Sequence, residues 1–174
     1  ASVAHVAVGL CAGRLVIDRD RDGGWTRGLA LCLGLCALAL LPDADVIAFR
    51  LRIPYSAPFG HRGASHSLLA ALVTGGCAGA LLRWLWRGRV SLALALGVCL
   101  AVALSHTLLD SLTDGGLGVA LLWPLDNRRF FAPWRPIPVA PIGRRLASAW
   151  GLRVLATESL WCLPLWLYAL RPRR

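Results

Sequence analysis

The chain has 174 residues, of which 57% are hydrophobic and 16% are charged, and its mean hydropathy is +0.61. This length suits one domain and the composition is too apolar for an ordinary soluble one, so we expect a single membrane-embedded domain over residues 1–174. The formal charge of +10 comes from 19 arginines and no lysine. No basic helix, aromatic stacking array or zinc-finger spacing accompanies that charge, so we expect anionic lipid head groups and the bilayer as partners and no nucleic acid.

Two apolar segments open the chain and predict helices over about 3–17 and 26–41. The first helix carries His5 in its first turn, among small residues. A lone histidine there is more simply structural, and it becomes a candidate ligand only with partners nearby. The second helix should end at Pro42, because a proline just past a helix end cannot continue the helix.

Asp43 and Asp45 follow that helix in the motif LLPDAD. Neighbouring carboxylates repel each other unless a cation separates them, which favours a metal site. An ordinary proline-aspartate turn, in which Asp43 bonds to its own turn, explains the pair equally well.

A loop then leads to about residue 65 and contains the motif HRGASHS, with His61, Arg62, Ser65 and His66. Ser65 is predicted to cap a helix over about 66–86, which places His66 in its first turn. The free amides of a helix start favour anions, so a metal, Arg62 and this helix end could together bind phosphate. The alternative is that Ser65 only caps the helix.

A fourth helix is predicted over about 90–112, with His106 and Asp110 near its end. Their spacing of four residues puts both on one helix face, where they could ligate one ion or bridge two. Taken alone, the pair is better explained as a histidine bonded to its own helix's carboxylate. The following stretch 114–143 is rich in Gly, Pro and Trp and predicts an ordered, partly interfacial loop.

A fifth helix, over about 152–170, carries Glu158 within an apolar run and is expected to tolerate Pro164. An ionisable group in such a run is costly, which suggests a role at the site as a base or a partner of a ligand. The alternative for Glu158 is an interfacial ion pair with Arg153.

An up-and-down arrangement brings the polar ends of the first four helices to the same end of the bundle. The expected fold is therefore an all-α membrane bundle of about five helices with a metal site at one membrane face. The candidate metal ligands are His5, Asp43, Asp45, His61, His66, His106 and Asp110. Imidazoles with carboxylates suit zinc, manganese or iron, and their number exceeds one tetrahedral shell, so we expect one or two divalent ions, zinc first and manganese second.

The order H(5)…LLPDAD…FGHRGASHSLLA…LSHTLLDSLTDGG…LLWPL resembles the YdjM-type family of bacterial membrane-bound metal-dependent hydrolases, from His5 to about Pro141. The resemblance implies an inner-membrane hydrolase with the same seven residues in its site, and it supplies a reaction class without a substrate. A looser likeness links the ligand order to zinc-dependent phospholipase C and the P1-type nucleases. No histidine follows His106, so their third metal position is not expected here.

These patterns predict a hydrolase that acts on a lipid through a metal-activated water, with a phosphoester as the first substrate and an ester or amide lipid as the alternative. The expected catalytic residues are Asp43, to orient or deprotonate the water, Arg62, to neutralise the phosphoryl charge, and Glu158. The alternative is a non-catalytic metal-binding membrane protein, either a transporter or a regulatory scaffold. A transporter would need polar groups at mid-helix depth, whereas here they gather at helix ends.

Arginines predict the orientation in the bacterial inner membrane. Three regions that share the end of the bundle opposite the candidate site are rich in arginine and should be cytoplasmic, although the other nine arginines lie on the candidate-site side. Their arginines are Arg14, Arg19, Arg21, Arg27, Arg83, Arg87, Arg89, Arg171, Arg173 and Arg174. The active-site side is then expected to face outward.

Overall fold

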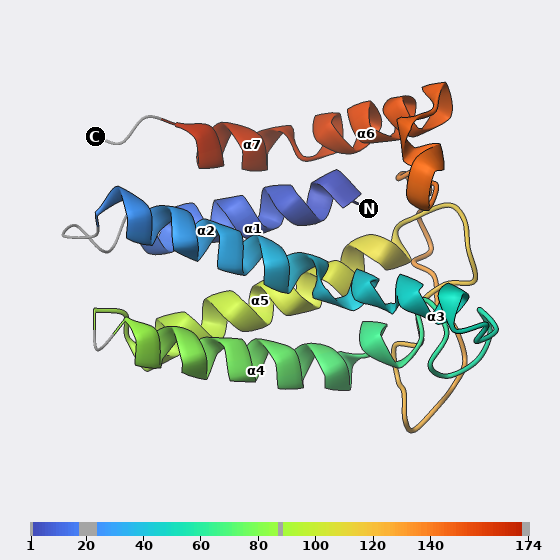
Figure 1. Cartoon of the computed structure of the whole chain (residues 1–174), viewed down its shortest axis with the longest axis horizontal. Helices are drawn as coiled ribbons and strands as arrows, with labels where there is room; N and C mark the ends of the chain where they lie inside the picture. Colours follow the sequence, from blue (N-terminus) through green and yellow to red (C-terminus); the bar gives the residue numbers. More distant parts are fainter. Residues whose placement is uncertain (1, 18–23, 87–88, 172–174) are drawn as a thin grey trace.

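Four long helices run up and down the body of the structure, and the computed structural model describes residues 2–17, 24–86 and 89–171. These helices are α1 (Ser2–Ile17), α2 (Trp25–Leu40), α4 (Leu68–Leu85) and α5 (Leu92–Ser111). Figure 1 shows them side by side, with α6 (Ala149–Trp161) and α7 (Leu163–Leu170) along one flank. The predicted all-α bundle of about five helices is confirmed.

Three helical stretches are long and apolar enough to cross a membrane: Trp25–Arg50, Leu68–Leu85 and Leu92–Ser111. Only 28%, 22% and 39% of their most apolar windows are buried inside the protein. Most of their apolar surface therefore faces outward, as a hydrocarbon environment requires. Helix α1 is apolar but shorter, and it lies against α2, α5, α6 and α7.

Small residues let α4 and α5 approach closely. A Cβ atom added at Gly75 would lie 2.9 Å from the Leu100 Cα, and one added at Gly79 would lie 2.8 Å from the Leu96 Cα. A side chain at either position would force the helices apart, so Gly75 and Gly79 are required by the helix contact.

The segment after α2 differs from the predicted loop. It continues as a 3₁₀ turn, η1 (Leu41–Val46), and a short helix, α3 (Ile47–Arg50). Pro42 lies at the start of η1, where its missing N–H group has no helical partner to lose. The proline therefore ends the α-helix α2, and the chain continues in helical conformation as η1 and α3.

Two further local predictions were wrong. Ser67 caps α4, since its Oγ accepts a hydrogen bond from the Ala70 amide at 3.0 Å, while Ser65 lies in the 3₁₀ turn η2 (Ala64–His66). The last helix is not continuous, because the helical conformation is interrupted at Cys162, between α6 and α7. Pro164 cannot donate the hydrogen bond that would continue α6, and it starts α7 instead.

The irregular chain between α5 and η3 (Gly143–Ala147) folds over the end of the bundle at which α5 finishes (Figure 1). Isolated β-bridges between Thr113 and Ile137 and between Val119 and Phe130 hold it in place. The Arg129 guanidinium donates hydrogen bonds to carbonyl oxygens of the neighbouring loop, those of Tyr55, Ala57 and His61. The predicted interfacial loop is therefore tied to the loop that leads to η2.

The arginine-rich side can be followed only in part. Arg27 lies in the first turn of α2 and Arg83 in the last turn of α4, at the end of the bundle opposite η1 and η2. Several of the arginines that carried the orientation prediction lie outside the described residues, namely Arg19, Arg21, Arg87, Arg173 and Arg174.

Candidate metal centre

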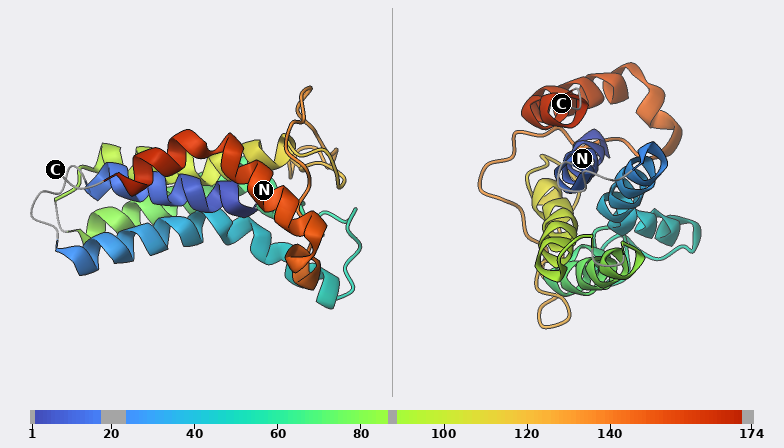
Figure 2. Two further views of the ribbon diagram at one scale, coloured as in Figure 1. Left: turned by 90° about the horizontal axis from the view of Figure 1, so that it is seen from above. Right: turned by 90° about the vertical axis from the view of Figure 1, so that its left-hand side faces the viewer.

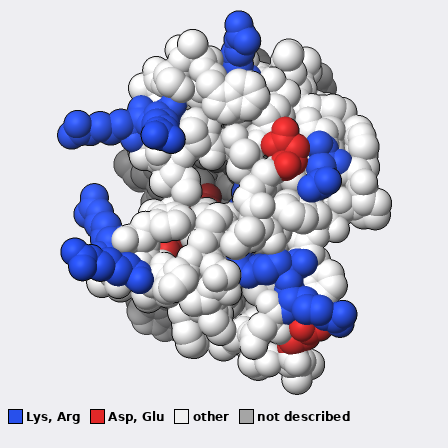
Figure 3. All heavy atoms as spheres, turned by 90° about the vertical axis from the view of Figure 1, so that its right-hand side faces the viewer, with Lys and Arg blue, Asp and Glu red and all other residues white. Residues whose placement is uncertain are grey.

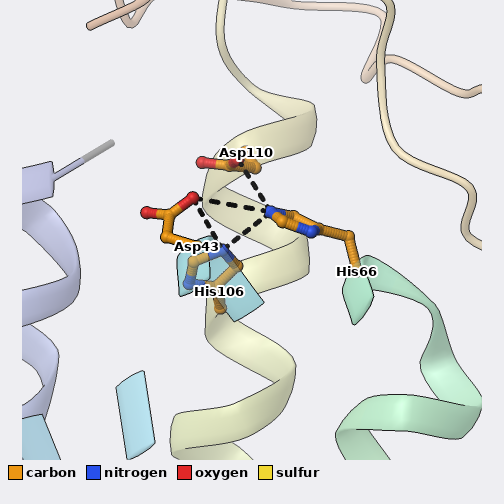
Figure 4. Close-up of side chains that lie close together, drawn as sticks. All are labelled: Asp43, His66, His106 and Asp110. Carbon is orange, nitrogen blue, oxygen red and sulfur yellow. Dashed lines mark hydrogen bonds and ion pairs between the residues drawn. The ribbon is translucent and has the colours of Figure 1, made fainter. Parts of the chain in front are cut away.

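The helix ends meet as predicted, and four of the seven candidate ligands form one cluster. Asp43 comes from η1, His66 ends η2, and His106 and Asp110 lie one turn apart near the end of α5. Each offers one ligand atom, and these four atoms lie within 4.8 Å of one another. Figure 4 shows the four side chains pointing toward a common point. We refer to them as the four-donor cluster.

The spacing inside the four-donor cluster suits a tetrahedral ion. The His66 Nε2 lies 3.0 Å from the His106 Nε2, 3.4 Å from the Asp110 Oδ2 and 3.7 Å from the Asp43 Oδ1. The His106 Nε2 also lies 3.7 Å from the Asp43 Oδ1. Donors held about 2.0–2.1 Å from a tetrahedral zinc ion stand about 3.3 Å apart, so these separations fit one ion.

Both histidines of the cluster direct Nε2 into it because Nδ1 is bonded elsewhere. The His106 Nδ1 lies 2.6 Å from the Ala39 carbonyl oxygen, which can only accept, so Nδ1 carries the proton and Nε2 the lone pair. The His66 Nδ1 lies 3.1 Å from the Asp45 Oδ2. A partner on the distal nitrogen fixes the tautomer and the ring direction, which is the usual arrangement of metal-binding histidines.

Carboxylates surround His66 and change its protonation. Burial alone lowers the pKa of His66, but its hydrogen bonds to Asp110, Asp43 and Asp45 outweigh burial and raise the pKa to about 10. The carboxylates around His66 therefore favour positive charge at this position. A divalent ion in the cluster supplies that charge in place of the proton on Nε2.

The cluster is buried except on one side. His66, His106 and Asp110 are at most 1% exposed, whereas the Asp43 side chain is 29% exposed. Figure 3 views the end of the bundle at which the cluster lies, and it shows a hollow with acidic atoms inside and arginines around it. Water and a ligand can therefore reach the cluster on the side at which Asp43 lies.

Asp45 and His61 lie behind the cluster and not in it. The Asp45 Oδ1 is bonded to the His61 Nδ1, and its Oδ2 accepts hydrogen bonds from the Ser65 hydroxyl and the Arg62 amide. All three contacts hold the carboxylate that orients His66. The structure therefore gives Asp45 and His61 a supporting position beside the cluster, and their predicted role as ligands remains a prediction.

Replacing Asp45 by asparagine should weaken zinc binding without abolishing it. The amide removes the charge that orients His66, and loss of such a partner lowers metal affinity by about 10–100-fold. A competition titration with a chromophoric chelator measures this change. Zinc affinity equal to that of the wild type would show that Asp45 does not orient the ligand.

His5 lies beside the cluster. Its ring stacks on His106 with the centroids 3.9 Å apart, and its Nε2 lies 3.3 Å from the Asp110 Oδ1. His5 is fully buried and reaches Asp110 on the oxygen that does not face His66. It therefore supports Asp110, and its predicted role as a ligand remains a prediction.

Arg62 is buried and bonded to protein groups. Its Nε lies 3.0 Å from the Asp110 Oδ2, and its Nη1 donates to the Thr113 hydroxyl and the Gly115 carbonyl. Its backbone has φ of 59°, a left-handed conformation that is uncommon outside glycine. The guanidinium thus holds Asp110 in place, which is a positioning role, and its predicted contact with a phosphoryl group remains a prediction.

Glu158 lies outside the four-donor cluster. Its Oε2 accepts hydrogen bonds from the Val3 amide at 2.8 Å and the Ala4 amide at 3.4 Å, and the residue is fully buried. A carboxylate at these amides satisfies unpaired donors and the positive end of the helix dipole. Glu158 therefore anchors the start of α1, next to His5, and its predicted role as a base remains a prediction.

Glu158→Ala should destabilise the protein but leave its zinc content unchanged. The part-buried amide of Val3 and the buried amide of Ala4 lose their acceptor, which costs about 1–3 kcal/mol. Glu158→Gln keeps an acceptor and should lower the thermal midpoint by less, so it serves as the matched control. Zinc loss in Glu158→Ala as complete as in a ligand variant would place Glu158 in the metal site.

Some supporting groups escaped the sequence analysis. The Thr107 hydroxyl donates to the His66 carbonyl, and the Thr113 hydroxyl donates to the Asp110 carbonyl while accepting from Arg62. Both threonines belong to the motif SHTLLDSLTDGG, so their closeness to His106 and Asp110 was a usable signal. The Ala39 carbonyl, which accepts from His106, could not be predicted from the sequence, because every residue has a backbone carbonyl.

The fold and this cluster define an all-helical membrane protein whose helix ends build a buried group of His and Asp residues able to hold a metal ion. A sequence model of the YdjM inner membrane protein family matches residues 1–171. The chain belongs to this family, as its motifs indicated.

A relative supports the same placement. The chain is 41% identical to "Inner membrane protein YbcI" of Escherichia coli (strain K12) over 161 residues, which cover 91% of this chain and 88% of the relative. No solved structure matches the chain. The predicted location in the inner membrane is confirmed, and the side that the cluster faces remains a prediction.

Proposed function

We propose that this protein is a metal-dependent hydrolase that cleaves a phosphoester of a membrane lipid. The observation that carries the proposal is the four-donor cluster, with separations that fit one divalent ion and one side open at Asp43. Zinc is the preferred ion and manganese the second candidate, because both accept imidazole and carboxylate ligands. Four donors in one cluster favour one ion over two.

The four donors are not held equally. His106 is fixed by the Ala39 carbonyl, His66 by Asp45, and Asp110 by Arg62. The contacts of Asp43, by contrast, are with the two histidines of the cluster. We therefore assign His66, His106 and Asp110 as the permanent ligands. Three protein ligands and one open position are the pattern of catalytic zinc sites.

Asp43 would act on the open side. Its partly exposed carboxylate is placed to orient a water molecule and to accept a proton from it. A divalent ion held there lowers the pKa of bound water and polarises a phosphoryl oxygen. Arg62 keeps Asp110 in position for this chemistry.

The location supports a lipid substrate. The cluster lies where membrane-spanning helices end, so a head group at the bilayer surface is within reach of it. The arginines around the hollow in Figure 3 favour an anionic group. A phosphoester of a lipid has both properties.

One observation favours a non-catalytic metal-binding protein, the alternative function. Four protein donors complete a tetrahedron, and closed tetrahedral sites are structural. Purified protein loaded with zinc should release the head group or phosphate from anionic phospholipid vesicles, stop when a chelator is added and resume with zinc. Protein that holds stoichiometric zinc but turns over none of a panel of phospholipids would support the alternative.

A further inference from the structure

An apolar groove runs along the bundle below the four-donor cluster. It has a volume of about 650 Å³, which is within the range of small-molecule sites. Helix α1 supplies its floor, α5 one wall and α7 the other, through residues such as Val8, Ala12, Val98, Gly97, Ala101 and Leu165. The end-on view in Figure 2 shows α1 between α7 and α5.

The groove and the cluster lie on the same helix faces. Along α5, Val98 and Val102 line the groove, and the same four-residue row continues to His106 and Asp110. The lining thus changes from hydrocarbon to metal-binding side chains within one turn of α5, about 5.4 Å.

Helix α1 shows the same change. Val8 and Ala12 line the groove at three and seven residues after His5, on the face that bears this histidine. The stacked rings of His5 and His106 therefore mark the end of the groove nearest the cluster.

The groove is almost wholly apolar, and its hydroxyl-bearing residues are Ser105 and Tyr168. The Ser105 hydroxyl already donates to the Val102 carbonyl at 2.7 Å. A polar ligand would lose its hydration there and gain few hydrogen bonds, whereas a hydrocarbon chain would gain contacts. The lining from Ala93 to Ser105 covers thirteen residues of α5, a rise of about 18 Å, close to one leaflet of a hydrocarbon core of about 30 Å.

We propose that this groove holds an acyl chain of the lipid whose phosphoester lies at the four-donor cluster. The inference rests on the proposed function for the head group, and on the groove alone for the chain. Substrate would then enter sideways from the bilayer, with its chain along α5 and its polar end at His106 and Asp43.

Gly97 offers a test, because a Cβ atom added there meets nothing within 4 Å. A Gly97→Phe side chain can therefore fill the groove without moving the backbone. Gly76 on α4 is the matched control, since its added Cβ also meets nothing and it lies outside the groove lining. Gly97→Leu is a milder second variant should phenylalanine impair folding.

The probe is phosphatidylglycerol with a photoactivatable diazirine in one acyl chain, added to chelator-treated protein so that labelling does not depend on turnover. Peptide mapping should find adducts on the groove residues of α1, α5 and α7. Labelling there should fall at least about five-fold in Gly97→Phe, in line with the loss of about 1 kcal/mol of apolar contact, and stay unchanged in Gly76→Phe.

The outcomes separate this inference from the proposed function. Groove labelling that Gly97→Phe removes, in a protein with no hydrolysis, supports the chain site and rejects the hydrolase. Labelling spread evenly over the lipid-facing helices, with no effect of Gly97→Phe, overturns the groove inference even if hydrolysis is found. A wild-type dimer that Gly97→Phe dissociates would overturn it too, because the groove would then be a contact between copies.

Discussion

Replacing His106 by alanine is expected to abolish stoichiometric zinc binding. His106 is one of the three proposed ligands that the surrounding protein holds in place, and its Nε2 lies 3.0 Å from that of His66. Loss of a supporting partner already lowers metal affinity by about 10–100-fold, so loss of the ligand itself should exceed about 100-fold. Elemental analysis of detergent-purified protein should give about one zinc per wild-type chain and almost none per His106→Ala chain.

The control for this experiment is Asp126→Asn. Asp126 pairs with the exposed Arg128 and lies outside the four-donor cluster, so its variant should keep its zinc. Thermal unfolding of both variants distinguishes loss of the ion from loss of the fold. Full zinc content in a folded His106→Ala protein would show that the cluster is not the metal site, and the proposed hydrolase would lose its basis.

The convergence of helix ends was predictable because it follows from topology. Apolar segments that alternate in direction must bring their polar ends to shared faces of the bundle, and the positions of His5, Asp43, His66 and His106 at those ends are visible in the sequence. The structure bears out this arrangement. Membrane location and family followed from apolar composition and from motifs that span nearly the whole chain.

The sequence could not predict which candidate residues lie in the four-donor cluster and which support it. Asp43 and Asp45 are two residues apart in a 3₁₀ turn, and only their side-chain directions place one in the cluster and the other behind His66. The same holds for Arg62, whose guanidinium turns inward to Asp110 from a left-handed backbone. Such directions depend on tertiary contacts that spacing along the chain does not encode.

Predictions of helix ends from neighbouring residues were wrong at two places, the start of α4 and the end of α6. Ser65 and Ser67 are both plausible caps, and the structure uses Ser67 for α4 while Asp45 takes the Ser65 hydroxyl. Pro164 was expected to be tolerated, but within the first turn of a new helix it loses no hydrogen bond, so the break between α6 and α7 is the lower-energy solution.

Asp43→Asn should keep the bound zinc and lose most of the hydrolytic activity. The asparagine side chain has nearly the same shape as aspartate, but it cannot accept a proton from water. General base catalysis contributes about 10²–10⁴-fold to a rate, so the turnover number should fall by that factor. Rates on the best phospholipid substrate, expressed per bound zinc, measure this loss directly.

The zinc content of the same variant tests whether Asp43 is a permanent ligand or a residue that acts on bound water. His66, His106 and Asp110 each have a protein group that fixes their direction, and Asp43, 29% exposed, is the donor that can move away from an ion. If Asp43→Asn loses zinc as completely as His106→Ala, Asp43 is a permanent fourth ligand. A closed tetrahedral shell leaves no position for water, and the non-catalytic function would then be favoured. Retained zinc with lost turnover supports an open catalytic site in which Asp43 handles the proton.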